Sequence, residues 1–156
     1  FKSINKFSGL NYRQQIIFQK KKLLIINDSK STSYSSSEEL LKIKSKIYWL
    51  IGGIPKKQDK LNLPKRYFKN IRVYIFGKYY QKFVNDFRNK IKIKKFKDIK
   101  RAVDAVLMDI NNNKVRKNII LFSPASASFD SFKNFEDRGL YFNKLIKRYL
   151  NERKIP

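Results

Sequence analysis

Short runs of apolar residues, which are typical of buried strands, alternate along this chain with segments of helical periodicity. The longest runs cover residues 23–26, 47–51, 71–76 and 119–122, and a shorter run covers 91–93. Lysines at 20–22 separate the first run from the apolar residues 16–18, which predicts a basic β-hairpin. The pattern therefore predicts a series of buried strands whose first member pairs with a short preceding strand.

Helices are predicted between and after these strands. Two overlapping Ser-x-x-Glu capping boxes predict a helix from about Ser36 to Lys44. Apolar residues also recur at helical spacing in 79–87, in 98–111 and in a long final segment that begins near Phe132. Strands that alternate with helices indicate a Rossmann-like α/β fold, in which helices cover both faces of a mainly parallel sheet.

The composition limits the chemistry that is available. The chain has 156 residues, enough for one compact domain, and contains neither Cys nor His, which excludes disulfides, thiolate chemistry and histidine acid–base catalysis. The formal charge of +25 is spread over every segment and accompanies many Ile, Asn, Phe and Tyr residues, as A/T-rich codons would produce. We interpret the lysines as a solvated surface, with a basic nucleic-acid-binding α/β module as the alternative. No apolar run is long enough for a transmembrane helix, so membrane insertion is not expected.

The first polar segment, Asn27 to Ser33, follows a predicted strand at the position where an open α/β sheet collects its ligands. Lys30 supplies a positive charge and Thr32 a hydroxyl, while Asp28 offers an acceptor for ribose hydroxyls or for the waters of a cation. The alternative is a simple turn in which Asp28 accepts backbone N–H groups and Lys30 is solvated.

The second polar segment, residues 123–139, follows the last predicted strand and reads Ser-Pro-Ala-Ser-Ala-Ser-Phe-Asp-Ser-Phe-Lys-Asn-Phe-Glu-Asp-Arg-Gly. Its small residues allow a ligand to approach the backbone, and Ser128 offers a hydroxyl near the free N–H groups expected at the start of the final helix. The alternative is that Ser128 or Asp130 caps that helix. Together the two segments predict a site for small anions.

These segments resemble successive signatures of the Mur ligase family. The matching stretches are Asn-Asp-Ser-Lys-Ser-Thr at 27–32, Ile-Gly-Gly at 51–53 with Lys56, and the whole of 123–139. Phe-Ser-Gly-Leu-Asn-Tyr-Arg at 7–13 also resembles the family's Phe-x-Gly-Leu-x-His-Arg, with Tyr12 in place of the histidine. The resemblance is nearest to the D-glutamate-adding members. It implies that residues 1–26 end a central ATPase domain and form a connecting strand, and that 27–156 form the carboxyl-terminal, amino-acid-binding domain.

The resemblance also implies an activity, namely the ATP-dependent addition of D-glutamate to UDP-N-acetylmuramoyl-L-alanine in the synthesis of peptidoglycan precursors in the bacterial cytoplasm. Thr32, Lys56, Ser128 and the backbone near Phe135 would hold the two carboxylates of D-glutamate. Lys30 would lie near the reacting phosphoryl group as the catalytic residue, and Arg13 and Asp28 would contact ATP. Lys57 is the alternative to Lys56.

The phosphate-binding motif that such an activity requires is missing from this chain. None of its five glycines lies in a Gly-x-x-x-x-Gly-Lys-Ser/Thr pattern, so ATP and Mg²⁺ are expected to be held mainly by amino-terminal and central domains outside it. The chain alone is not expected to hydrolyse ATP, and no metal ligands are assigned to it. A stand-alone dinucleotide-binding enzyme is excluded because residues 27–33 contain no glycine.

Overall fold

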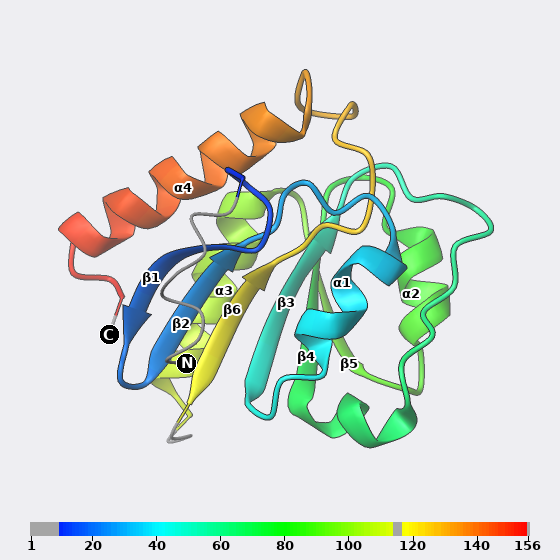
Figure 1. Cartoon of the computed structure of the whole chain (residues 1–156), viewed down its shortest axis with the longest axis horizontal. Coiled ribbons are helices and arrows are strands. Elements are labelled where there is room, and N and C mark those ends of the chain that lie inside the picture. The colour runs from blue at the N-terminus through cyan, green and yellow to red at the C-terminus, as the bar shows by residue number, and fades with distance from the viewer. Residues whose placement is uncertain (1–9, 114–116, 156) are drawn as a thin grey trace.

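The computed structural model describes residues 10–113 and 117–155. These residues form a six-stranded sheet of order β1-β2-β6-β3-β4-β5 with helices packed against it (Figure 1). The strands are β1 (Gln15–Lys20), β2 (Leu23–Asn27), β3 (Lys46–Gly52), β4 (Ile71–Phe76), β5 (Lys92–Phe96) and β6 (Asn118–Phe122). Strands β1 and β2 form the predicted antiparallel hairpin, and the other neighbouring pairs are parallel. The prediction of a mainly parallel sheet is therefore confirmed.

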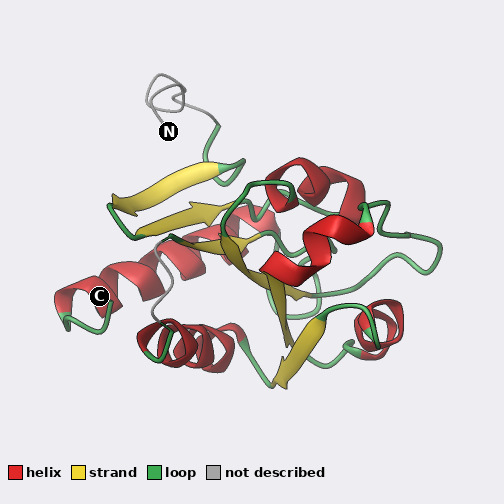
Figure 2. Ribbon diagram, turned by 90° about the horizontal axis from the view of Figure 1, so that it is seen from below, coloured by secondary structure: helices red, strands yellow, loops and turns green. Residues whose placement is uncertain are grey.

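Helices cover both faces of this sheet (Figure 2). Helices α1 (Tyr34–Leu41) and α2 (Gln81–Phe87) and the short 3-10 helix η2 (Lys65–Asn70) pack on one face. Helices α3 (Ile99–Asn111) and α4 (Phe135–Asn151) pack on the other. This layered arrangement confirms the Rossmann-like α/β fold.

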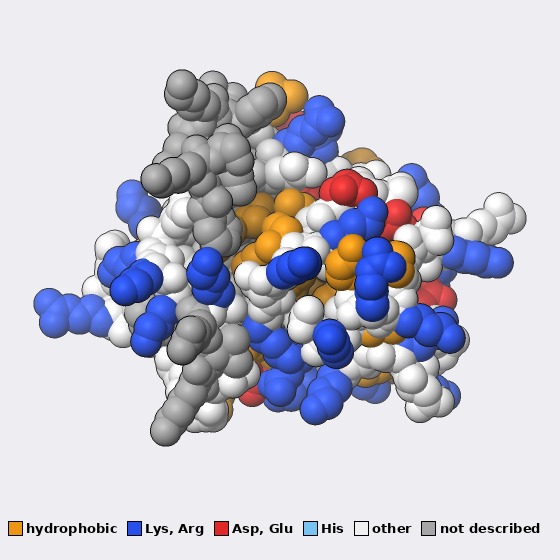
Figure 3. All heavy atoms as spheres, turned by 60° about the horizontal axis from the view of Figure 1, so that its bottom comes forward, with side chains coloured by type: hydrophobic (Ala, Val, Ile, Leu, Met, Phe, Trp, Pro, Cys, Tyr) orange, Lys and Arg blue, Asp and Glu red, His pale blue; other side chains and the backbone are white. Residues whose placement is uncertain are grey.

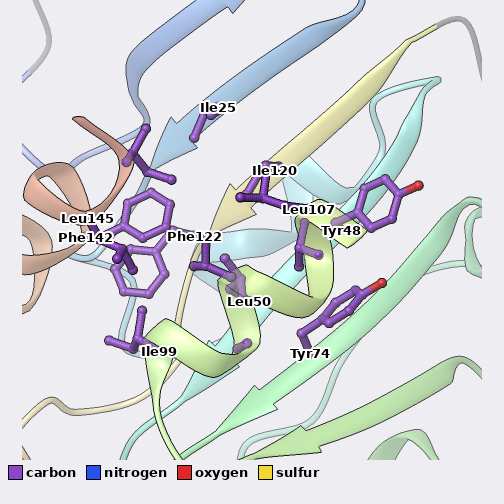
Figure 4. Packing of buried hydrophobic residues seen from close by; sticks show 14 of the residues in the cluster. Ile25, Tyr48, Leu50, Tyr74, Ile99, Leu107, Ile120, Phe122, Phe142 and Leu145 are labelled. Carbon is purple, nitrogen blue, oxygen red and sulfur yellow. The ribbon is translucent and has the colours of Figure 1, made fainter. Parts of the chain in front are cut away.

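The core has two halves because successive side chains of a strand point to opposite faces of the sheet. In β3, Trp49 packs toward α1 and α2, whereas Tyr48 and Leu50 pack toward α3 and α4. Figure 4 shows the second half, in which the rings of Phe122 and Phe142 stack with centroids 4.2 Å apart. Strands that are buried on both faces read as continuous apolar runs, which is why the sequence pattern located them.

Helix α1 begins and ends earlier than the capping boxes predict. Ser33 is its N-cap, and the backbone N–H of Ser33 donates to Oγ of Ser36 (3.3 Å). The glutamates of the predicted boxes have other partners. Glu38 accepts a hydrogen bond from the backbone of Asn62 (2.9 Å), and Glu39 pairs with the lysine that follows the helix (2.7 Å).

Helix α4 begins later than its aromatic pattern predicts. Asn134 is its N-cap, and the Asn134 side chain accepts a hydrogen bond from the backbone of Asp137 (2.8 Å). The alternative in which Ser128 or Asp130 caps this helix is therefore wrong. Phe132 continues the apolar pattern without being helical, because its ring packs beside α4 in the loop that precedes it.

Two other elements also differ from the predicted bounds. Strand β5 extends beyond the apolar residues 91–93 because it is the edge strand, where exposed residues such as Lys94 and Lys95 are accommodated. Helix α2 begins after Tyr79 and Tyr80, whose side chains are exposed. Apolar patterns report burial, so they misplace the ends of half-exposed elements.

The chain leaves the carboxyl ends of two neighbouring central strands toward opposite faces of the sheet. Strand β2 leads to α1 on one face, and its neighbour β6 leads to α4 on the other. Ligands of open α/β sheets bind at such a switch point. Both polar segments begin here, since Asn27 ends β2 and Ser123 follows β6.

The predictions for the amino-terminal motif and for the domain boundary are not tested by the described structure. Residues 7–9 of the predicted 7–13 motif lie outside the described residues, and the division between residues 26 and 27, which falls within β2, stays a prediction. Within 10–113 and 117–155, no helix combines the length and the apolar character that a membrane crossing needs.

Candidate active site

A buried arginine ties the two polar segments together. Arg138, early in α4, is only 1% exposed. Its Nη2 and Nε donate to the carbonyl oxygen (2.7 Å) and Oγ (3.1 Å) of Ser29, and its Nη1 donates to the carbonyl oxygen of Ser126 (3.0 Å). Burial lowers the pKa of Arg138 to about 10, so the group stays charged at neutral pH. The guanidinium thus holds the loops after β2 and β6 in fixed positions relative to α4.

The end of β2 is also bonded directly to α4. The side-chain amide of Asn27 donates to the carbonyl oxygen of Gly139 (2.9 Å) and to Oδ1 of Asn143 (2.7 Å). Oγ of Ser29 donates to the carbonyl oxygen of Phe135 (2.7 Å). These bonds place the first turn of α4, including the predicted Phe135 backbone, beside the loop that carries Lys30.

Asp28 is buried in the same scaffold. Its Oδ1 accepts the backbone N–H of Gln14 (3.0 Å), and its Oδ2 accepts the hydroxyl of Ser123 (2.7 Å), which lies 2.5 Å from the hydroxyl of Ser37 in α1. Burial raises the pKa of Asp28 to about 6, although both hydrogen bonds and the charge of Arg13 oppose the rise. In the turn alternative, Asp28 would accept backbone N–H groups. It does accept one, but the donor is Gln14, in the arm formed by the described residues that precede β1.

That arm is seated on α4 and on the loop after β2. The backbone N–H of Lys30 donates to the carbonyl oxygen of Tyr12 (3.0 Å), and the Tyr12 ring covers Gly139. A Cβ at position 139 would lie 2.4 Å from Cδ1 of Tyr12, so only glycine allows this contact. The structure therefore brings Arg13, Asp28 and Lys30 together around the end of β2.

Lys56 and Ser128 lie on a second pair of loops, which follow β3 and β6. These loops are joined by two backbone hydrogen bonds between Ile54 and Ala127 (2.9 and 3.1 Å). A shallow hollow beside them is lined by Ser33, Ser35, Lys56, Lys57, Gln58 and Asp59. Both candidate lysines line this hollow, and Thr32 directly precedes its first residue.

Four of the predicted ligand-binding side chains have polar atoms that the protein leaves open. Among the described residues, no hydrogen bond or ion pair engages the side chain of Lys30, Thr32, Lys56 or Ser128. Lys30 and Lys56 are exposed, Thr32 is half-buried, and Ser128 is 3% exposed. Nζ of Lys30 lies 5.9 Å from the centroid of the Phe135 ring.

The chemistry of this arrangement is that of binding and orientation. Cations and hydroxyls converge on one edge of the sheet, where they can hold carboxylates or phosphates. Within the two described ranges, no group of three or more Asp, Glu, His or Cys side chains could hold a metal ion. The residues present therefore fit an anionic ligand, whereas a resident Mg²⁺ would need ligands from elsewhere.

Arg138 is not among the site residues predicted from the sequence. It stands in the third signature, but nothing in the helical pattern distinguishes it from Arg148, which is exposed at the other end of α4. The available signal was the glycine that follows it, since a glycine inside a helical pattern marks a position where another group packs closely, here the Tyr12 ring.

No protein-family model matches this chain, but known proteins align with almost its whole length. The UDP-N-acetylmuramoylalanine--D-glutamate ligase of Rickettsia felis is 36% identical over 152 residues, and that of Rickettsia prowazekii is 35% identical over 148. These alignments cover 96% and 94% of this chain but 33% of each relative, so the chain spans about a third of their length.

A solved structure has the same fold. MurF from Acinetobacter baumannii superimposes with a TM-score of 0.57 over 94% of this chain and 33% of that one. At 12% sequence identity, this likeness concerns the fold alone.

Proposed function

Because this chain is a Mur ligase carboxyl-terminal domain, and its relatives in Rickettsia are UDP-N-acetylmuramoylalanine--D-glutamate ligases, we propose that it binds D-glutamate and orients its amine for amide formation. The complete ligase would use ATP to convert the carboxylate of UDP-N-acetylmuramoyl-L-alanine into an acyl phosphate. The amine of D-glutamate would attack the acyl carbon, forming the amide bond and releasing phosphate. This reaction belongs to peptidoglycan precursor synthesis in the bacterial cytoplasm.

The observation that carries the proposal is the separation of polar groups at the carboxyl edge of the sheet into two sets. Asp28, Ser29, Ser123 and Ser126 are buried and bonded to the protein itself. The open groups of Lys30, Thr32 and Ser128 lie on the same two loops, and Lys56 lies on the adjoining loop after β3. A rigid hydrogen-bonded layer that presents unpartnered cations and hydroxyls suits precise placement of a dicarboxylic amino acid.

The proposed roles follow from charge and position. Thr32, Lys56 and Ser128, with the backbone N–H at Phe135, would hold the two carboxylates of D-glutamate. Lys30 would stabilise negative charge on the reacting phosphoryl group, where a fixed cation contributes most.

ATP would be contacted from this chain by Arg13 and Asp28. Each oxygen of Asp28 already accepts one hydrogen bond and retains a second lone pair. The phosphates and Mg²⁺ would be held mainly by the amino-terminal and central domains of the ligase, which are its proposed partners. Neither the relatives nor the geometry of this edge supports the alternative of a nucleic-acid-binding module.

The test is Ser128→Ala in the complete gene product that contains this chain. Loss of one hydroxyl from a carboxylate site should raise the KM for D-glutamate about tenfold and leave the KM for ATP within about twofold. Ser131→Ala is the matched control, because Ser131 is an exposed serine of the same loop. An unchanged KM for D-glutamate in Ser128→Ala, or an equal rise in Ser131→Ala, would contradict the proposed site.

A further inference from the structure

A second polar cluster lies at the amino ends of the parallel strands, opposite the carboxyl ends that carry the candidate active site. The proposed function makes no use of it. Lys46 begins β3, Lys92 begins β5, and Arg72 lies between them near the start of β4. Arg72 is in register with Tyr48 on one side and Lys92 on the other, and Lys46 shares the face of Tyr48. Figure 3, in which the bottom of Figure 1 comes forward, shows many Lys and Arg side chains and few acidic ones on this side of the molecule.

The cations of this cluster lack a counter-charge. Among the residues that the structure describes, Nε of Arg72 is buried without a hydrogen-bond partner, and no carboxylate forms an ion pair with Lys46, Arg72 or Lys92. Burial and the charges of Arg72 and Lys92 lower the pKa of Lys46. Asp109 is the carboxylate that interacts with Arg72 through space, but it is already bonded to Lys94 (2.8 Å) and to the hydroxyl of a tyrosine in β4.

A hollow opens beside these cations. It is lined by Arg72, Val73, Tyr74, Lys92, Ile93 and Lys94. From Arg72 to the carboxyl end of β4 the strand rises about 13 Å, so the hollow is separate from the candidate active site. It contains what an anion site requires, namely space, positive charge at Arg72 and Lys92, and a guanidinium for which the described residues supply no hydrogen-bond acceptor.

We propose that the hollow lined by Arg72 and Lys92, with Lys46 close by at the start of β3, binds a phosphate group, as inorganic phosphate or as a phosphate ester. A tetrahedral dianion can accept from the guanidinium of Arg72 and meet the flanking ammonium groups, whereas a single carboxylate would neutralise less of the charge. Binding supplies hydrogen-bond acceptors to the guanidinium of Arg72 and reduces the mutual repulsion of the cations. This site is independent of the proposed ligase function.

A nucleic acid is a poorer fit to the same surface. Single-stranded nucleic acids stack their bases on exposed aromatic rings. The aromatic residues of this cluster, Tyr48 and Tyr74, are 0% and 1% exposed, so their faces are covered. The geometry therefore favours a small anion held by Arg72 over a strand that tracks a basic surface.

The experiment is an NMR titration of the ¹⁵N-labelled chain with inorganic phosphate, at constant ionic strength balanced by chloride. The expected result is saturable shifts of amide signals around Lys46, Arg72 and Lys92. Arg72→Gln should weaken phosphate binding about tenfold or more, and Lys92→Gln severalfold. Lys144→Gln, which removes the same charge from an exposed position on α4, should leave the affinity unchanged within about twofold.

Several results would overturn the proposal. These are an absence of saturable phosphate binding, an equal loss of affinity in Lys144→Gln, or shifts that appear only with a mixed-sequence oligonucleotide and vanish steeply with salt. If Arg72→Gln does not fold, Lys92→Gln decides the outcome, because Lys92 is exposed and its replacement leaves the core intact. Unweakened binding in that variant would reject the site.

Discussion

Arg138 and Arg72 lie at opposite edges of one sheet, and each has buried guanidinium atoms. Arg138 donates to Ser29 and Ser126 and is enclosed by the loops that it joins. Arg72 has a buried Nε without a partner and lies among other cations. The partners of a cation, rather than the number of cations, therefore separate a structural residue from one available to a ligand. A formal charge of +25 does not distinguish the two.

The largest expected effect comes from removing each guanidinium in turn. Arg138→Met leaves two buried carbonyl oxygens without donors and should lower the free energy of unfolding by roughly 3 kcal/mol or more. Arg72→Met removes an unpaired donor and a source of repulsion, so the change should stay within about 1 kcal/mol. Urea unfolding midpoints measure both, and Arg148→Met serves as the exposed control on α4. Equal losses of stability at positions 138 and 72 would contradict the distinction between a bonded and an unpaired arginine.

A smaller effect concerns the carboxylates of the two edges, which should respond to pH in opposite directions. Burial raises the pKa of Asp28 from 3.8 to about 6, so the native state binds this proton more tightly than the unfolded state. The contribution of Asp28 to stability should therefore fall by about 2–3 kcal/mol as the pH rises from about 4 to above 6. Asp28→Asn should remove that fall.

Asp109 provides the contrast within the same measurement. Burial opposes its ionisation, but its bonds with Lys94 and with the tyrosine of β4 lower its pKa overall. Its contribution is present above the ordinary aspartate pKa and is lost as the pH falls below it. Unfolding of wild type, Asp28→Asn and Asp109→Asn across pH 3 to 8, roughly the range in which carboxylates with shifted pKa values titrate, separates the two. The same pH dependence in wild type and Asp28→Asn would argue against a buried, ionisable Asp28.

The smallest expected effect is the change in stability with salt that the cluster of Lys46, Arg72 and Lys92 produces. Screening should relieve the repulsion around Arg72, so added NaCl should stabilise the wild type by a few tenths of a kcal/mol more than Lys92→Gln. Lys144→Gln should keep the wild-type response, because it removes an equal charge far from the cluster. Thermal unfolding at low and high ionic strength makes this measurement. Identical salt responses in the two variants would show that the cluster carries no special repulsion.

The sequence pattern located the sheet well because burial on both faces leaves a continuous apolar signal. The predicted strand 71–76 coincides with β4, and the hairpin at β1 and β2 was predicted from its lysine turn. Local polar signals were less reliable. The capping boxes at Glu38 and Glu39 misplaced the start of α1, since those glutamates bind groups elsewhere. The N-cap of α4 is Asn134 rather than Ser128 or Asp130.

The order of elements, the two polar loops at strand ends and the residue types offered to a ligand all follow from the amino-acid sequence alone. Which polar groups the protein engages and which remain open depends on tertiary packing. Arg138 and Ser29 meet across 109 residues of chain, and Arg72 meets Lys92 by strand register, so neither contact leaves a local pattern. Burial and hydrogen-bond partnership belong to the packed molecule, because they depend on atoms that periodicity along a segment does not describe.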